Sequence, residues 1–212
     1  MSNAGRPFFQ TNPLACARAL IGCELVWGKT AGIIVETEAY SEIDDEACHT
    51  FLRQGARRFI RERPAGSLYV YLNYGVHWLL NLLVRDGAGT GFVLVRALEP
   101  TSGLEIMRER RKVGKVEALC SGPGKLTQAL AINGTSHGQD FFALAEAAIR
   151  LPERTAALET DRRVGITKSA DLEWRFLAKG SPFVSVKKPA PESSEAGTNP
   201  PAPAFVPQGR LG

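Results

Sequence analysis

One stretch of the chain, residues 33–40, reads Ile33-Ile34-Val35-Glu36-Thr37-Glu38-Ala39-Tyr40. Its β-branched start and the alternation that follows predict a β-strand, whose side chains point in turn to opposite faces of a sheet. One face of that strand would carry Ile34, Glu36, Glu38 and Tyr40. Because this face begins with an isoleucine it enters the core, where ionised carboxylates are rarely left without partners or a task. The two glutamates therefore belong either to the solvated end of an edge strand or to a site with a catalytic carboxylate beside a stacking ring.

An acidic segment leads from this strand to a histidine, His49. Asp44, Asp45 and Glu46 precede it, and acidic side chains at the start of a short helix interact favourably with its positive end. Helix capping therefore accounts for the acids but not for His49. This histidine is either a hydrogen-bonded structural side chain or a participant in chemistry at the carboxylate strand.

The length and composition indicate one globular domain followed by a tail. The chain has 212 residues, of which 44% are hydrophobic and 23% charged, which is ordinary for a globular protein. Residues 1–7 are interpreted as a tag or disordered N-terminus, residues 8–188 as the domain, and the Pro-rich residues 189–212 as a disordered tail. The net charge of +4 allows binding to nucleic acid without requiring it.

The four cysteines are scattered along the chain, without the paired spacing of a zinc or redox motif. We therefore expect free, buried thiols and no bound metal. No apolar run approaches the roughly 20 residues that a membrane-spanning helix needs, and no signal peptide precedes Phe8. The expected protein is soluble and intracellular, without a membrane partner.

The hydrophobic pattern changes between the periods of helices and strands along the rest of the chain. Asn12 and Pro13 are typical of a helix start, and Gly22 of a helix end. The basic segment 53–63 lacks a clear apolar period and is interpreted as a mobile surface loop. The remaining predictions are hairpins over residues 23–40 and 67–84, strands over 92–98, 145–151 and 180–186, and helices over 102–112 and 127–132.

Several side chains are unusual for the elements on which they are predicted to lie. Tyr74 stands at the tip of a hairpin, where it either folds back over the sheet or wedges between stacked bases, as in proteins that bend DNA. Asn81 interrupts an apolar strand and needs a hydrogen-bond partner in the protein or in a ligand. Arg96 needs an anion, which is either Glu99 or a phosphate. Lys125 lies beside a glycine-containing loop that opens a helix, an arrangement that can bind an anion.

Six motifs, taken in order, resemble the alkyladenine (3-methyladenine) DNA glycosylase family. They are Val35-Glu36-Thr37-Glu38-Ala39-Tyr40, Asp45-Glu46-Ala47-Cys48-His49, Leu68-Tyr69-Val70-Tyr71 with Tyr74-Gly75 and Asn81, Arg96-Ala97-Leu98-Glu99-Pro100, Ser121-Gly122-Pro123-Gly124-Lys125-Leu126, and Gly180-Ser181-Pro182. Each is weak alone, but six in the same order with compatible spacing are specific, and they cover the chain from Leu14 to Val186. The resemblance implies a single mixed α/β (α+β) domain around a curved antiparallel β-sheet, with flanking helices and a protruding β-hairpin.

The resemblance also implies a role for each matching residue. Glu38 falls where the family carries the carboxylate that activates the attacking water. Tyr40, His49 and Tyr71 fall on the pocket that sandwiches the extruded base, and Asn81 matches an amide that helps to reject the exocyclic amino group of normal guanine. The expected DNA-binding residues are Tyr74, which would replace the extruded base in the duplex, and Val76, His77, Arg96, Lys125, Gly180 and Ser181.

The function implied by this resemblance is DNA repair by a glycosylase that flips alkylated or deaminated purines out of duplex DNA and hydrolyses the N-glycosidic bond. The expected enzyme is a monofunctional DNA-3-methyladenine glycosylase without a cofactor, because no lysine lies in the pocket motifs to form a Schiff base. Its expected partner is double-stranded DNA containing damaged purines. We expect a monomer that is DNA-associated, in the cytoplasm and nucleoid or in a nucleus.

Two other functions are compatible with the same residues. A metal-dependent nuclease or hydrolase would use Glu36, Glu38 and His49 and would lose activity with a chelator, whereas the glycosylase would work in EDTA. A non-catalytic nucleic-acid-binding domain would keep its function after Glu38→Gln. Segment 57–63 departs from the family, which more usually has an Arg-Asn pair and a Met-Phe pair there, so the DNA contacts of that loop do not carry over.

Overall fold

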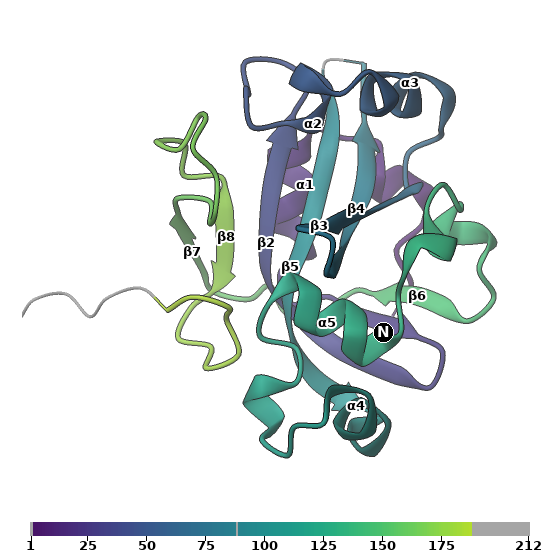
Figure 1. The fold of residues 1–212 in the computed structure, drawn as a ribbon, viewed down its shortest axis with the longest axis vertical. Helices are drawn as coiled ribbons and strands as arrows, with labels where there is room; N and C mark the ends of the chain where they lie inside the picture. The colour runs from purple at the N-terminus through teal and green to yellow at the C-terminus, as the bar shows by residue number, and fades with distance from the viewer. Residues whose placement is uncertain (1, 88, 188–212) are drawn as a thin grey trace, which may run out of the picture.

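The computed structural model describes residues 2–87 and 89–187, and the statements below refer to these residues. The strands are β1 (Glu24–Trp27), β2 (Thr30–Ser41), β3 (Leu68–Asn73), β4 (His77–Arg85), β5 (Thr90–Ser102), β6 (Ala147–Arg150), β7 (Leu158–Asp161) and β8 (Arg175–Ala178). The α-helices are α1 (Pro13–Leu20), α2 (His49–Leu52), α3 (Gln54–Glu62), α4 (Leu104–Arg111) and α5 (Pro123–Leu130). The strands form one antiparallel sheet, in which the long strands β2 and β5 bend along their length (Figure 1). The expected fold class is confirmed.

The order of strands in the sheet is β3-β4-β5-β2-β1-β6. The first residues of β2 pair with β1, and its later residues, from Glu36 to Glu38, pair with β8, which also pairs with β7. On its other side β2 pairs with β5 along almost its whole length. The carboxylate strand therefore lies inside the sheet rather than at its edge.

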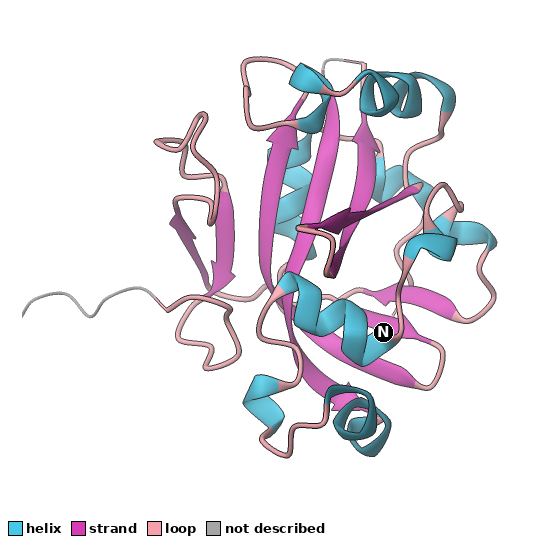
Figure 2. Cartoon of the chain, in the orientation of Figure 1, coloured by secondary structure: helices cyan, strands magenta, loops and turns pink. Residues whose placement is uncertain are grey.

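Two clusters of buried side chains hold the elements together. The larger cluster joins the sheet to α1 and α5, and α1 lies behind the upper parts of β2 and β5 in Figure 2. The smaller cluster joins α3 to the sheet through side chains that include Phe59, Tyr69 and Phe92. All four cysteines are buried free thiols, as expected. None of the helices in the described ranges has the length and apolar character needed to cross a membrane.

The start of α1 follows directly from its sequence. The Asn12 side chain accepts a hydrogen bond from the Ala15 amide at 2.9 Å and so caps the helix, while Pro13 occupies the first helical position, where no amide hydrogen is needed. Thr37 of β2 donates its hydroxyl to the Ala17 carbonyl at 2.8 Å. This hydrogen bond fixes one face of β2 against α1.

The second predicted hairpin is confirmed as β3 and β4, with a tight turn at Tyr74 and Gly75. Both residues have positive φ angles, 51° and 68°, and the Val76 amide donates to the Asn73 carbonyl at 3.1 Å. Positive φ at both central positions is typical of a type I′ turn, which matches the twist of the flanking strands. A tyrosine rarely adopts this conformation, so the fold holds Tyr74 in a strained position.

The expectation that Ile34 shares a face with the two glutamates is wrong. The pairing of β2 with β5 shifts between Ile34 and Glu36, and again between Glu36 and Thr37, which marks a β-bulge on the ladder. Ile34 consequently belongs to the larger core cluster, together with Ala39. The glutamates lie on the opposite face because the bulge changes the phase of the alternation.

Segment 53–63, interpreted above as a mobile loop, is instead largely the helix α3. Its Ala56, Phe59 and Ile60 are buried, at the spacing of three and four residues that marks one face of a helix. Arginines fill the intervening positions and lower the mean hydropathy of the segment, so the short apolar face was missed. The helix packs over the smaller core cluster.

The first described residues and the last strand of the sheet also differ from expectation. Residues 2–7 are not disordered: Asn3 pairs with Arg150, the Ala4 amide donates to the Ile149 carbonyl at 2.8 Å, and Arg6 forms an ion pair of 2.6 Å with Asp140. The last strand of the sheet is β8 and not segment 180–186, which follows it without strand structure. The predicted tail, residues 189–212, lies outside the described residues.

We predict that Phe59→Ala lowers the free energy of unfolding by roughly 3 to 5 kcal/mol, because it empties the space that Phe59 fills in the smaller core cluster. Chemical denaturation would measure this loss. Arg58→Ala, on the exposed side of the same helix, is the control and should cost less than about 0.5 kcal/mol. Equal effects of the two substitutions would contradict the assignment of the buried face.

Candidate active site

A cavity of about 310 Å³ opens on the face of the sheet that carries the two glutamates. Aromatic rings form much of its wall, and Leu79, Leu94 and Ile166 add apolar surface. Six residues that the sequence pointed to line it together: Tyr40, His49, Tyr71, Tyr74, Asn81 and Arg96. Segments far apart in the chain therefore meet around one space.

Glu38 lies immediately behind the wall of this cavity, with no exposed surface. Its Oε2 accepts hydrogen bonds from the Tyr40 hydroxyl at 2.8 Å and from Arg96 Nη1 at 3.3 Å, and its Oε1 accepts from the Val164 amide at 2.7 Å. All three donors belong to residues that line the cavity. Three hydrogen bonds therefore hold the Glu38 carboxylate in one orientation at the wall of the cavity.

Tyr40 is a donor to this carboxylate and also a wall of the cavity. Burial, together with the neighbouring Glu38, raises the pKa of Tyr40 well above its usual value, so the phenol keeps its proton at neutral pH. The back of its ring is occupied, because the Arg163 guanidinium lies 4.6 Å from the ring centroid. One face of Tyr40 is therefore left for a ligand.

Arg163 is a buried residue that the sequence analysis did not identify as important. Its guanidinium bonds both carboxylate oxygens of Asp45, at 2.6 and 2.8 Å, and also lies 5.2 Å from the Trp174 ring centroid. Asp45 in addition accepts from the Ser41 and Ala47 amides. The expectation that the acidic segment caps a helix is thus wrong for Asp45, which instead neutralises an arginine behind Tyr40.

Arg96 is buried on β5, and its carboxylate partners within the protein are Glu36 and Glu38 rather than Glu99. Its Nε donates to Glu36 Oε1 at 2.9 Å and its Nη1 to Glu38. Glu36 also accepts from Arg175 Nε at 2.8 Å. Burial raises the pKa of Glu36, but Arg96, the Ser185 amide and Arg175 outweigh it and hold the value below its usual range. The phosphate contact expected of Arg96 stays a prediction.

His49 lies at the start of α2 with its ring tilted over Tyr71, at a centroid distance of 4.4 Å. Its Nδ1 is 3.1 Å from the Tyr69 hydroxyl. Burial and the positive charge of Arg53 lower the pKa of His49 to about 4, so the imidazole is neutral at physiological pH. Tyr69, which the sequence analysis quoted only as part of a motif, thus fixes the orientation of the histidine.

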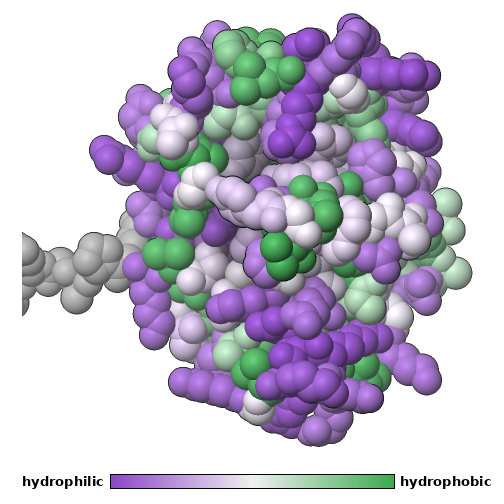
Figure 3. All heavy atoms as spheres, viewed as in Figure 1, coloured by the Kyte–Doolittle hydropathy of each residue, from purple (hydrophilic) through white to green (hydrophobic). Residues whose placement is uncertain are grey.

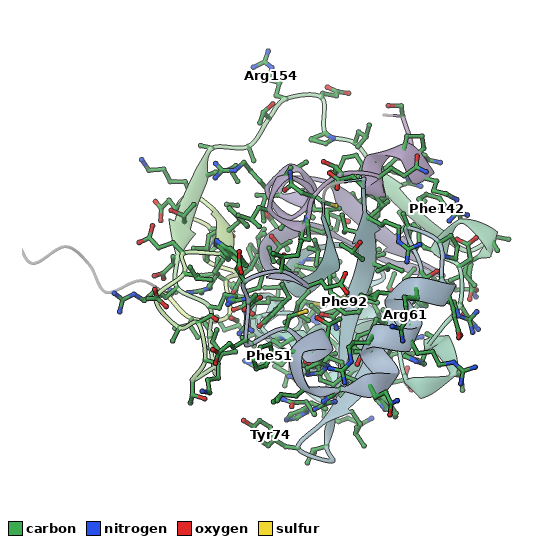
Figure 4. The ribbon with its side chains drawn as sticks, turned by 90° about the horizontal axis from the view of Figure 1, so that it is seen from above. Phe51, Arg61, Tyr74, Phe92, Phe142 and Arg154 are labelled. Carbon is green, nitrogen blue, oxygen red and sulfur yellow. The ribbon has the colours of Figure 1, made fainter. Side chains whose placement is uncertain are left out.

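Tyr74 reaches the mouth of the cavity from the hairpin tip and is 83% exposed. In Figure 4 it projects away from the body of the protein, whereas Phe92 lies inside it. Figure 3 shows a small apolar group at the centre of the face viewed in Figure 1, among side chains of intermediate hydropathy, with hydrophilic side chains farther out. The exposed apolar residues of the hairpin are Leu72 and Val76, at 44% and 70%. The tip therefore exposes one aromatic ring and two apolar side chains to solvent.

The other predicted site residues occupy different places. Val76 and His77 line a groove between the hairpin and α5, and Lys125 is exposed on α5, with Nζ 3.4 Å from Ser121 Oγ. Gly180 and Ser181 line a separate hollow beside β7 and β8. The DNA contacts expected of these residues stay predictions.

Two of the side chains that a metal-dependent nuclease or hydrolase would use, Glu36 and His49, contact other residues of the protein. Glu36 is held by two arginines, and the His49 ring lies against Tyr69. In the part of the chain that the structure describes, no three His, Cys, Asp or Glu side chains are grouped as a metal site requires.

Asn81 lines the cavity, and its Nδ2 donates to the Tyr69 carbonyl at 3.1 Å.

A buried carboxylate behind an aromatic cavity, next to an exposed aromatic side chain, suits the class of enzymes that act on a single base held outside a duplex. The family model of methylpurine-DNA glycosylase (MPG) matches residues 7–182 of this chain. The chain therefore belongs to the methylpurine-DNA glycosylase family. It is a DNA glycosylase of DNA repair, and DNA is its substrate.

Similar proteins from three bacteria carry the name "Putative 3-methyladenine DNA glycosylase". The protein of Agrobacterium fabrum is 49% identical and the match covers 85% of this chain and 91% of the relative. The protein of Prosthecochloris aestuarii is 39% identical, over 92% and 97% of the two chains. That of Chlorobaculum tepidum is 40% identical, over 90% and 94%.

We predict that the His49 side chain stays neutral in the folded protein from pH 8 down to about pH 5, because its pKa is near 4. NMR titration of the imidazole would measure this directly. Arg53→Ala should raise the pKa of His49, since it removes a nearby positive charge. A titration midpoint near the usual histidine value in the wild type would contradict the burial described here.

We predict that Glu36→Gln lowers the free energy of unfolding at pH 7 by about 3 kcal/mol, because two buried arginines each lose one of their carboxylate partners. The pKa of Glu36 is depressed on folding, so its stabilisation is complete above the usual glutamate pKa of about 4.3 and is lost as the pH falls through the lower folded value. The difference between wild type and variant should therefore shrink at acid pH. Denaturation at several pH values would test this.

Proposed function

We propose that the protein releases alkylated or deaminated purines from duplex DNA by hydrolysis of the N-glycosidic bond. The observation that carries this proposal is the position of Glu38, which is fully buried yet hydrogen-bonded to three residues of an aromatic cavity. The carboxylate is held in one orientation before any ligand arrives. Such preorganisation is what a site needs to activate a water molecule without first rearranging.

A purine inside the duplex cannot reach this cavity, so the nucleotide has to rotate out of the stack. Extrusion costs a few kcal/mol and is cheapest for a damaged, poorly paired base. Tyr74 is exposed at the mouth of the cavity and would fill the gap in the stack, as wedge side chains do in other proteins that bind DNA. Its strained backbone presents the ring outward rather than against the sheet.

The extruded base would lie against Tyr40 on one side and against His49 and Tyr71 on the other. A positively charged alkylpurine would gain cation–π attraction of order 0.5 to 2 kcal/mol from such rings. Because Arg163 already occupies the back of Tyr40, this gain is smaller than for a free ring. Stacking of the base on these rings needs no charge, so it would also contribute to the binding of neutral lesions such as hypoxanthine.

The chemistry is a displacement at the sugar carbon. A water molecule, giving its proton to Glu38, forms a bond to C1′ as the bond from C1′ to the purine nitrogen breaks, and the negative carboxylate stabilises the oxocarbenium-like sugar. A cationic alkylpurine leaves with the bonding electrons as a neutral base, whereas a neutral lesion such as hypoxanthine leaves as an anion that takes up a proton from water. No lysine occurs among the described residues that line the cavity. We therefore propose hydrolysis to an abasic site without a Schiff-base step.

Glu38→Gln should lower the single-turnover rate of base release by about a thousandfold, since the amide cannot accept the proton of water. Duplexes that each carry 3-methyladenine, 7-methylguanine, hypoxanthine or etheno-adenine would be assayed in EDTA, which also ranks these lesions as substrates. Binding of the damaged duplex should persist in the variant.

Glu42→Gln is the matched control, because Glu42 is exposed just beyond the end of the same strand. It should release bases at the wild-type rate. Base release by Glu38→Gln at the wild-type rate would overturn the proposed role, and loss of wild-type release in EDTA would favour the metal-dependent alternative.

A further inference from the structure

The segment that follows β8 reaches back into the sheet through Ser185. The Ser185 amide donates to Glu36 Oε2 at 2.5 Å, and its hydroxyl donates to Glu36 Oε1 at 2.7 Å. The same hydroxyl accepts from Arg96 Nη2 at 3.2 Å. In the next residue, the Val186 carbonyl accepts from Arg175. A half-buried serine thus lies between a buried carboxylate and a buried guanidinium.

Each of the three guanidinium nitrogens of Arg96 donates one hydrogen bond. Nε donates to Glu36, Nη2 to Ser185 and Nη1 to Glu38. Because the guanidinium is planar and its donors have a fixed geometry, fixing Nε and Nη2 also fixes the direction of Nη1. The contacts of Nε and Nη2 with Glu36 and Ser185 therefore determine where Nη1 meets Glu38.

We infer that Ser185 is a positioning residue for base release, which holds Arg96 so that its Nη1 stays against Glu38. This inference rests on the proposed role of Glu38. Ser185 does not line the cavity, so it acts through Arg96 and not on the substrate. The segment after β8 thereby becomes part of the machinery that orients the carboxylate.

The contacts of the hydroxyl distinguish this role from a simple attachment of the segment to the sheet. The Ser185 amide and the Val186 carbonyl would hold the backbone in place without any side chain. Without the hydroxyl, Arg96 Nη2 loses the acceptor described here in a buried environment, where an unsatisfied donor is costly. The guanidinium would turn toward another acceptor and draw Nη1 away from Glu38.

The test compares Ser185→Ala with Ser185→Thr in the full chain. We expect Ser185→Ala to slow single-turnover release of hypoxanthine by at least about tenfold, because small displacements of catalytic groups are costly. Affinity for the damaged duplex should change less than about twofold, since the substrate contacts are intact. Ser185→Thr keeps the hydroxyl and should restore most of the rate.

Val184→Ala is the matched control, because it shortens a half-buried side chain of the same segment without removing a hydrogen-bonding group. It should leave the rate constant unchanged. A merely structural role of Ser185 would lower the melting temperature or the amplitude of the single turnover but not the rate constant of the folded fraction. A wild-type rate constant in Ser185→Ala would overturn the inference while leaving the role of Glu38 intact, which Glu38→Gln tests separately.

Discussion

The structure depends on the pairing of carboxylates buried on and beside β2 with arginines that arrive from other elements. Glu36 is held by Arg96 and Arg175, and Asp45 by Arg163. An unpaired charge in this position would cost several kcal/mol, so each acid constrains where its arginine must lie. These pairs determine how β5, β8 and the loop after β7 close around the carboxylate strand.

The same pairing explains why the site is rigid. The Val164 amide reaches Glu38 because its neighbour, Arg163, is anchored by Asp45 between Tyr40 and Trp174. One ion pair therefore positions both a wall of the cavity and a donor to the carboxylate. Fixed dipoles of this kind stabilise developing charge without the reorganisation that water would need.

The sequence predicted those elements that depend on interactions between residues close together in the chain. The capped helix at Asn12, the hairpin around Tyr74 and the carboxylate strand itself all follow from residues close together in the chain. Partners far apart in the chain were not predictable in this way: Arg163 is 118 residues from Asp45, and Ser185 is 149 residues from Glu36. The bulge that turns Ile34 away from the glutamates has no periodic signal, and the short apolar face of the arginine-rich helix α3 is obscured by its low mean hydropathy.

The N-terminal residues cover part of an edge of the sheet. β6 is the last strand on its side of the sheet, and Asn3 and Ala4 lie along its free side. An open strand edge offers unpaired amide and carbonyl groups on which a second chain can form a ladder. By pairing with part of that edge through their backbone, these residues leave fewer of its amide and carbonyl groups open to a second chain.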